Sequence, residues 1–248
     1  MNPDNASASR VKAQRKGSYG LDAPKFLLIP AVLIAANIVT GVVSGRGWPF
    51  LAAALVMGGA GLSLYASRRG KFVVWAELLD QLRLRGDERI LDIGCGRGAV
   101  LTMAAQHLTT GRAVGVDLWR KGDQSGNAVE ATLRNAAAEE VADRVELRTA
   151  DMTTLPFEDN SFDVVVSSMA IHNVDRARRD RAIDEAVRVL RPGGHLMIAD
   201  LFSTHQYRTH LARRGMIDIG RRGLGWRMWW TGPWLLTHLV SATKPVGR

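Results

Sequence analysis

The stretch Ile90–Gly98, which reads ILDIGCGRG, decides the fold. Its apolar run carries one acid, Asp92, and then becomes rich in glycine. The glycines stand at alternate positions: Gly94, Gly96 and Gly98. Glycine permits a sharp turn and lets a ligand approach without a Cβ in the way, and a helix start offers free N–H groups and a partial positive charge. The stretch therefore predicts a strand, a tight turn and a helix N-terminus that together bind a nucleotide-like ligand.

The spacing of these glycines separates two classes of ligand. A dinucleotide-binding turn usually reads G-x-G-x-x-G, because a pyrophosphate sits on the helix end. Here the pattern is G-x-G-x-G, and Asp92 stands two residues before the first glycine, where its charge would repel a pyrophosphate. The acid suits a ligand with a positive amino-acid head, such as S-adenosylmethionine. The alternative is an ordinary glycine-rich turn in another doubly wound protein.

Composition excludes several kinds of site. An apolar fraction of 46% in 248 residues is enough for one domain with a sizeable core and some length to spare. Cys95 is the only cysteine, so neither an internal disulfide nor a four-cysteine zinc site can form. The six histidines lack ligand spacing, so we expect no metal. The net charge of +9 fits nucleic acid, an anionic membrane surface or simple solubility, depending on where the charges lie.

The N-terminal part of the chain differs in character from the rest. Residues 1–25 are polar and basic, which predicts a disordered tail. Phe26–Gly45 then runs twenty residues without a charge, and Pro49–Ser67 runs nineteen more. Helices of this length reach across the roughly 30 Å hydrocarbon core of a bilayer. We expect a transmembrane helical hairpin over residues 26–69, with two buried helices of a soluble core as the alternative.

Two details favour the membrane interpretation. Neither apolar segment shows the polar face that a core helix usually has. Trp48 and Tyr65 lie near the ends of the second segment, where interfacial aromatic residues belong. The second segment also has a run of small residues on which the first could pack closely, formed by Gly58, Gly59, Ala60, Gly61 and Ser63.

The basic residues predict the topology of this hairpin. They flank it on both sides, whereas the short link between the segments holds only Arg46. They are Arg10, Lys12, Arg15, Lys16 and Lys25 before the hairpin and Arg68, Arg69 and Lys71 after it. The positive-inside rule then places both termini and the following domain in the cytoplasm, as in a two-pass protein of the cell membrane. Because the membrane topology accounts for part of the net positive charge, we expect no nucleic-acid partner.

Residues 70–248 alternate between strand and helix patterns. Phe72–Leu84 predicts an amphipathic helix that leads into this domain or rests on the membrane surface. The expected strands are Arg89–Ile93, Arg112–Val116, Arg144–Arg148, Phe162–Ser167 and His195–Ala199, followed by the weaker Met216–Arg222 and Leu235–Ala242. The expected helices are Ala99–Leu108, Asn127–Val141, Asp175–Leu190 and His205–Arg214. This order predicts an α/β fold, a Rossmann-like, doubly wound, mostly parallel seven-stranded sheet preceded by two transmembrane helices.

Five motifs in this order resemble the class I S-adenosylmethionine-dependent methyltransferases, most closely the branch that modifies small molecules, quinones and lipids. They are LDIGCGRG at Leu91–Gly98, VGVD at Val114–Asp117, ADMTTLPF at Ala150–Phe157, SFDVVVSS at Ser161–Ser168 and VLRPGG at Val189–Gly194. The resemblance covers roughly residues 72 to 244 and not the hairpin. It implies an enzyme that uses S-adenosylmethionine as cofactor and transfers its methyl group.

The resemblance also implies which residues bind the cofactor: Asp92, Gly94, Cys95, Gly96, Gly98, Asp117, Leu118, Trp119, Asp151, Met152 and Ser168. In the family the glycine loop holds the methionine part, and Cys95 is a small spacer there rather than a nucleophile. Asp117 would take both ribose hydroxyls, since a carboxylate can accept a hydrogen bond from each. Asp151 would accept the adenine amino group. The alternatives are a turn cap for Asp117, a plain loop acid for Asp151 and a shielding role for Trp119.

In this family, the segment after the fourth strand, here Ser168–Val174, contacts the methyl acceptor. It lacks an Asn-Pro-Pro-Tyr type motif, which argues against an exocyclic base nitrogen as acceptor. His172 is the candidate general base, because the pKa of free histidine lies near working pH. The alternative is that His172 only packs beside the cofactor, and His205 is a second candidate.

Four of the seven tryptophans lie within Gly223–Trp234, at Trp226, Trp229, Trp230 and Trp234. Three roles are open for them: they line a pocket for an apolar acceptor, they sit at a membrane interface as an anchor, or they pack as core. With the hairpin, they predict a membrane-anchored methyltransferase for a lipophilic small molecule, quinone-like or lipid, at the cytoplasmic face. The alternatives are a methyltransferase for a soluble metabolite and a non-catalytic S-adenosylmethionine-binding membrane module.

Overall fold

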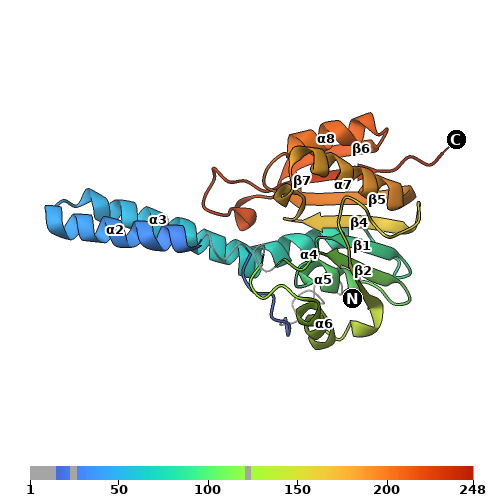
Figure 1. The fold of residues 1–248 in the computed structure, drawn as a ribbon, viewed down its shortest axis with the longest axis horizontal. Helices are drawn as coiled ribbons and strands as arrows, with labels where there is room; N and C mark the ends of the chain where they lie inside the picture. The colour runs from blue at the N-terminus through green and yellow to red at the C-terminus, as the bar shows by residue number, and fades with distance from the viewer. Residues whose placement is uncertain (1–14, 23–26, 121–123, 248) are drawn as a thin grey trace, which may run out of the picture.

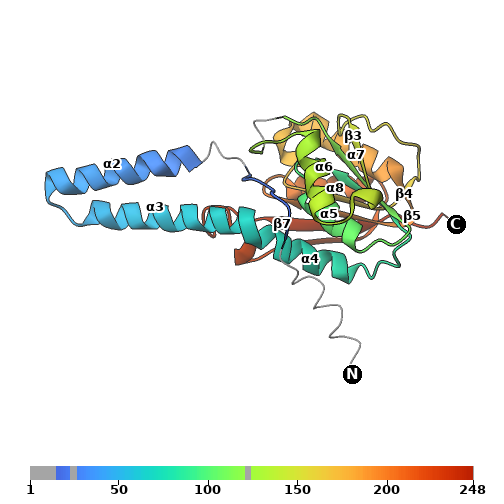
Figure 2. The same cartoon turned by 90° about the horizontal axis from the view of Figure 1, so that it is seen from below.

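A pair of antiparallel helices projects from a layered α/β domain in the computed structural model, which describes residues 15–22, 27–120 and 124–247 (Figures 1 and 2). The helices are α2 (Leu28–Ser44) and α3 (Trp48–Tyr65). Most of their large apolar side chains are exposed, for example Val43 at 82%. The projection therefore presents a hydrophobic surface outside the domain.

The two helices do not pack through the predicted small-residue face. A Cβ added at Gly58 or Gly61 would meet no atom within 4 Å, so these glycines face open space. The close approach lies instead at Gly41 of α2, where an added Cβ would lie 2.7 Å from the ring of Phe50. An aromatic ring thus fills the space against a glycine near the tip of the hairpin. Gly59 contacts a different segment, described below.

The helix α3 continues into the domain. A short π-helical segment, η2 (Ala66–Gly70), joins it to α4 (Lys71–Gln81), so the helix runs 34 residues from Trp48 to Gln81. The charged residues after Ser67 do not end the helix, because helical hydrogen bonds form between backbone groups whether the side chains are apolar or charged. In α4, Trp75 and Leu79 are fully buried in the domain. The helix therefore packs into the domain through this face.

The sheet has seven strands in the order β3-β2-β1-β4-β5-β7-β6. They are β1 (Arg89–Ile93), β2 (Arg112–Asp117), β3 (Val145–Thr149), β4 (Phe162–Ser168), β5 (Leu190–Asp200), β6 (Ile217–Gly223) and β7 (His238–Thr243). The pairs among β1 to β5 are parallel, and β7 runs antiparallel to β5 and β6. This confirms the predicted Rossmann-like, mostly parallel sheet.

Helices cover both faces of the sheet (Figure 1). One layer holds α4, α5 (Ala99–Gln106) and α6 (Val129–Ala138), and the other holds α7 (Arg176–Val189) and α8 (Thr204–Arg213). Successive strand residues alternate between the layers, as Ile90 packs toward α4 and α5 while Leu91 packs toward α7 and α8. Both are fully buried, which explains why β1 reads as a continuous apolar run.

The strand β5 begins earlier than predicted. The helix α7 ends at Val189, and Leu190 is already extended, with φ −73° and ψ 134°. Pro192 disfavours helical geometry in the residue before it, so the chain leaves the helix just ahead of the proline. Leu190 then pairs with Phe162, and a register shift between Phe162 and Val164 absorbs the extra residues.

Residues 15–22 are packed on the domain, so the expected disordered tail does not describe them. Tyr19 is 7% exposed, its ring packs edge-on against Phe72, and its hydroxyl lies 2.8 Å from Thr102 Oγ1. The carboxylate of Asp22 accepts a hydrogen bond of 2.7 Å from Lys71 Nζ. These contacts offset the entropy lost on ordering the segment. The rest of the predicted tail, residues 1–14 and 23–25, lies outside the described residues.

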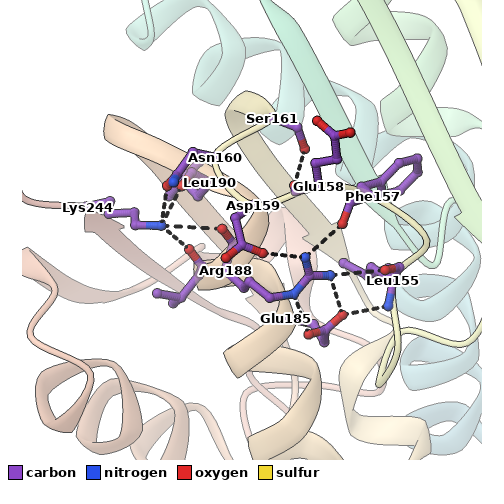
Figure 3. Close-up of polar contacts among 11 residues, drawn as sticks. Leu155, Phe157, Glu158, Asp159, Asn160, Ser161, Glu185, Arg188, Leu190 and Lys244 are labelled. Carbon is purple, nitrogen blue, oxygen red and sulfur yellow. Dashed lines mark hydrogen bonds and ion pairs between the residues drawn. The ribbon is translucent and has the colours of Figure 1, made fainter.

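The loop between β3 and β4 is held by Arg188 of α7 (Figure 3). Its guanidinium donates to the carbonyl oxygens of Leu155 at 3.0 Å and Phe157 at 2.7 Å. It also forms an ion pair of 2.7 Å with Glu185, and together with Asp159 this carboxylate raises the pKa of the guanidinium. Since this loop includes Asp151, these bonds also hold one edge of the predicted site.

Candidate active site

The carboxyl ends of three adjacent strands meet at one edge of the sheet. The glycine turn follows β1, and a Cβ added at Gly94 would lie 2.3 Å from the Cβ of Ala170, which follows β4. Asp117, the last residue of β2, accepts a hydrogen bond of 2.8 Å from the N–H of Gly96. Because β1 lies between β2 and β4, this edge is the switch point where doubly wound sheets bind ligands. The structure therefore brings together residues that the sequence predicted from separate motifs.

The turn depends on glycine at two points. Gly94 has φ +72° and, as above, no room for a Cβ. Gly98, the residue before α5, has φ +79°. Other residues rarely adopt such angles. The turn therefore keeps its backbone open to a ligand at the N-terminus of α5.

Asp92 is a buried acid without a partner. It is 1% exposed, and neither carboxylate oxygen has a hydrogen-bond partner among the described residues. Burial, helped by the negative charge of Asp117, raises the pKa of its carboxyl to about 8. A buried carboxylate is costly unless it is paired. This position therefore fits a ligand with a positive group, such as the amino-acid head of S-adenosylmethionine.

Asp117 caps the glycine turn and also the turn after β2. Besides the bond from Gly96, its carboxylate accepts one of 2.6 Å from the N–H of Trp119. The capping alternative is thus present in the structure. It does not exclude ribose hydroxyls as further donors, since a carboxylate offers about four acceptor directions. The contact with ribose remains a prediction.

Leu118 and Trp119 follow β2 at the same edge. Leu118 is 39% exposed, which leaves an apolar surface open. Trp119 has φ +56° and donates its Nε1–H to Thr149 Oγ1 at 2.8 Å. The indole therefore hydrogen-bonds to the last residue of β3, the strand next to β2. Its contact with adenine remains a prediction.

Asp151, at the end of β3, already has partners. Arg178 of α7 binds it at 2.5 Å, and the N–H of Thr153 donates to it at 2.9 Å. Burial acts to raise the pKa of this carboxyl, but the hydrogen bonds from Thr153 and the charge of Arg178 outweigh it and hold the pKa below its ordinary value. An adenine amino group would therefore share Asp151 with Arg178. Met152 is adjacent, and its N–H donates no hydrogen bond to the described residues.

Two further predicted residues, Ser168 and Cys95, lie in the same region of the domain. The hydroxyl of Ser168, at the end of β4, accepts a hydrogen bond of 2.8 Å from Trp75 Nε1–H, which fixes α4 to this edge. Cys95 is 7% exposed, and burial with the charges of Asp92 and Asp117 raises the pKa of its thiol well above the usual value. A thiol held in this form is a poor nucleophile, in agreement with a spacer role.

His172 lies just beyond β4, in η4 (Ile171–Asn173), and faces Asp200 at the end of β5. Its Nδ1 hydrogen-bonds to this carboxylate, and its backbone N–H donates to the same group at 3.0 Å. Asp200 is fully buried and accepts a third hydrogen bond from the hydroxyl of Tyr207 at 3.1 Å. Because a carboxylate only accepts, Nδ1 carries the proton and Nε2 is left as an acceptor. This is the arrangement of an oriented general base.

Residues 91–198 match the family model described as a methyltransferase domain. The chain is 35% identical over 128 residues to a ubiquinone/menaquinone biosynthesis C-methyltransferase of Roseobacter denitrificans. It is also 35% identical over 130 residues to a demethylmenaquinone methyltransferase of Symbiobacterium thermophilum. These matches cover 51% and 52% of this chain and 48% and 49% of the relatives, so the chain spans about half the length of the curated relatives it matches. Residues 91–198, somewhat less than half of the chain, therefore resemble a methyltransferase domain.

A solved structure agrees with the methyltransferase fold. It is a geranyl diphosphate C-methyltransferase from Streptomyces coelicolor, with a TM-score of 0.57 at 18% identity. The match covers 70% of this chain and 79% of that protein. At such low identity the likeness concerns the fold alone.

The residues of this site fit the predicted cofactor, S-adenosylmethionine. The unpaired carboxylate of Asp92 suits the positive amino-acid head, and Asp117 retains capacity to accept hydrogen bonds. The individual contacts remain predictions.

Sequence reasoning missed two partners in this methyltransferase site, Asp200 for His172 and Arg178 for Asp151. His172 and Asp200 are 28 residues apart, and only the parallel pairing of β4 with β5, which sets Ser168 beside Ala199, brings them together. The available signal was an acid directly after a predicted strand. His205, the second candidate base, lies exposed on α8.

Proposed function

We propose that this chain is a membrane-anchored methyltransferase that transfers the methyl group of S-adenosylmethionine to a lipophilic small molecule at the cytoplasmic face of the cell membrane. The acceptor is a quinone-like ring or a lipid. The observation that carries the proposal is the attachment of a methyltransferase domain to an exposed apolar hairpin, α2–α3 (Figure 2).

The hairpin has the length and surface of a membrane anchor. Among the described residues, the helix Trp48–Gln81 is the one long and apolar enough to cross a membrane, and α2 is a shorter apolar helix of 17 residues. At about 1.5 Å per residue, α2 and α3 each extend roughly 25 Å, close to the hydrocarbon thickness of a bilayer. A core helix would hide its apolar side chains, whereas Leu55 is 69% and Val42 70% exposed.

The charges at the two ends of α3 support the orientation. Arg68 and Arg69 are exposed at the domain end, and Arg46 lies at the tip. Lys71 does not contribute, because its side chain is 6% exposed and its ammonium is paired with Asp22 at 2.7 Å. With the excess of basic residues at the domain end, the positive-inside rule supports a cytoplasmic domain.

Relatives and site chemistry support the acceptor class. Two relatives carry names for quinone substrates, ubiquinone/menaquinone and demethylmenaquinone. Beside His172 lies the ring of Phe202, 55% exposed and 6.3 Å away between ring centroids. This ring offers an apolar surface to a flat acceptor next to the free Nε2.

Methyl transfer needs alignment and one proton acceptor. The bound cofactor supplies a methyl group already activated on a sulfonium. The domain holds the acceptor in line with it, which replaces a bimolecular encounter by a fixed geometry. His172 Nε2 takes the proton from an acceptor hydroxyl or acidic carbon, and Asp200 stabilises the imidazolium that results. A methyl acceptor that loses no proton would not need this pair.

The test compares the full chain in bilayers with a variant whose residues 28–64 are replaced by a flexible linker. This variant keeps residues 15–22, which belong to the domain. Both proteins receive methyl-labelled S-adenosylmethionine and membrane quinone or lipid extracts. We expect equal cofactor binding but label transfer mainly by the full chain. Equal transfer by both would reject the role of the membrane, and cofactor binding without transfer to any extract would reject the acceptor class.

A further inference from the structure

A finger of apolar residues connects β6 to β7. Met228–Thr237 carries no charged side chain. Trp229 and Leu236 form an antiparallel bridge, and the Nε1–H of Trp230 donates to Thr237 Oγ1 at 3.1 Å. The tip of this connection, residues 231–234, lies between Trp230 and Leu235, and the backbone N–H of Trp230 donates to the carbonyl oxygen of Leu235 at 3.5 Å. We call residues 226–237 the tryptophan finger.

The tryptophan finger lies along α3. A Cβ added at Gly59 would lie 2.8 Å from the carbonyl oxygen of Thr231, and one added at Gly70 would lie 1.8 Å from that of Arg227. These two glycines let the backbone of the finger touch the helix. In Figures 1 and 2 the orange-red connection before β7 extends from the sheet toward the hairpin. The finger therefore runs away from the domain in the same direction as α2 and α3.

Some side chains of the finger are buried and others are exposed. Met228 is fully buried and Trp230 is 8% exposed. By contrast, Trp226 is 54%, Leu236 38% and Trp234 75% exposed. The four tryptophans therefore do not all pack as core. Buried residues brace the finger while it presents apolar side chains outward.

The level of the finger along α3 is set by its contacts. Gly59 precedes Arg68 by nine residues, so Thr231 lies about 13 Å farther out along the helix than the first exposed arginine. Between these levels Trp226 stacks on Tyr65, with ring centroids 5.1 Å apart. If the arginines lie at the headgroups, this pair is at the depth where interfacial tryptophan and tyrosine are enriched. The tip then reaches the acyl chains.

We propose that the tryptophan finger is a second membrane-inserting element that enters the same leaflet as the hairpin and sets the depth and tilt of the domain. The inference rests on the proposed anchoring of α2 and α3. The occupant of its exposed surface is lipid, because this surface is continuous with the apolar hairpin and the stretch from Met228 to Thr237 is uncharged.

Insertion of the finger would also affect the position of the sheet edge that carries Asp200 and His172. His238, the first residue of β7 after the finger, pairs in register with Asp200 of β5. The finger is therefore attached directly beside the carboxylate that orients His172. A domain held by both the hairpin and the finger keeps this edge at a fixed distance from the membrane, where a lipophilic acceptor is concentrated.

An environment-sensitive fluorophore on single introduced cysteines tests the inference in the full chain. The positions are Trp234→Cys at the finger tip, Val43→Cys in the hairpin and Arg213→Cys on exposed α8. The native Cys95 is 7% exposed, so the unsubstituted protein reports background labelling. Each protein is placed in phosphatidylcholine/phosphatidylglycerol nanodiscs with spin-labelled acyl chains. We expect blue-shifted, quenched emission at 234 and 43 and neither effect at 213.

The outcomes separate the two proposals. Quenching at 43 without quenching at 234 would overturn the finger while leaving the hairpin anchor standing. No quenching at either position would overturn the anchor and the finger together. A blue shift at 234 that lipid spin labels do not quench would mean that a second copy covers the tip, which also overturns insertion. Trp234 is largely exposed, so the substitution leaves the core intact, and cofactor binding checks this.

Discussion

Asp200 binds His172 twice, through the imidazole Nδ1 and through the backbone N–H at 3.0 Å. The same carboxylate accepts a hydrogen bond from the hydroxyl of Tyr207, and it is fully buried. Such a group fixes both the tautomer and the position of the ring. The pair leaves His172 with one ring nitrogen that has no partner among the described residues, as the proposed general base requires.

Replacing His172 by alanine should lower kcat by about 10²–10⁴-fold, the usual contribution of a general base, without changing cofactor affinity. Asp200→Asn should also lower kcat, because an amide can donate to Nδ1 and favour the wrong tautomer. Tyr207→Phe removes one of several donors to Asp200 and serves as the matched control, with a smaller loss. Single-turnover rates and calorimetry measure the two quantities. An unchanged kcat in His172→Ala would leave His172 a packing role only.

Cofactor affinity should depend on pH through Asp92. With a pKa of about 8, this carboxyl is mostly protonated at pH 7 in the free protein. A cationic ligand binds the ionised form, so affinity should rise by up to about tenfold per pH unit below pH 8 and then level off. Binding near pH 7 should release close to one proton, measured by calorimetry in buffers of different ionisation enthalpy. Asp92→Asn should lose both effects, and a flat pH profile in the unsubstituted protein would contradict the pairing.

The same carboxyl should lower the stability of the cofactor-free protein. Its pKa is raised on folding, so the native state binds more protons than the unfolded state between the ordinary value of 3.8 and about 8. Stability attributable to Asp92 therefore falls as pH rises through this window. At pH 8 the Asp92→Asn variant should melt at a higher temperature than the parent, and at pH 4 the difference should shrink. A lower Tm at pH 8 would contradict this.

Asp117 should contribute to cofactor binding through the ribose. Asp117→Ala should weaken binding by about 1–3 kcal/mol, the scale of hydrogen bonds to a charged group. This substitution also removes the caps on Gly96 and Trp119, so a 2′-deoxy cofactor analogue is needed as a second arm. If the carboxylate binds the ribose, the variant should discriminate far less against the deoxy analogue than the parent does. Equal discrimination by both proteins would rule out that contact.

The ion pair between Lys71 and Asp22 should stabilise the domain. Lys71→Met leaves a partly buried carboxylate without its cation and should cost about 2 kcal/mol of unfolding free energy. Asp22 also accepts from Gln124, whose Oε1 in turn accepts from the N–H of Arg97 in the glycine turn. We therefore expect weaker cofactor binding as well. The control is Lys16→Met, whose partner Glu140 is exposed, and thermal denaturation should show no change there.

Local features of the fold could be predicted closely from the sequence. The strand β1 has the bounds expected for it, and the glycine turn, with Gly94 and Gly98 at positive φ, lies where the motif indicated. These features depend on a few neighbouring residues whose backbone preferences act independently of the rest of the chain. The end of α7 was placed one residue late, since pairing of Leu190 with Phe162 is a property of the sheet.

The sequence by itself determined the alternation of strands and helices along the chain, the apolar hairpin segments and the residue types at the predicted cofactor site. Periodicity, glycine spacing and charge depend only on residues that are neighbours in the sequence. Only the tertiary structure decided that Asp200 orients His172, that residues 15–22 pack on the domain, and that Gly59 contacts Thr231 rather than α2. Each of these joins residues far apart in the chain. Their contact depends on how strands pair and helices dock, which no local pattern encodes.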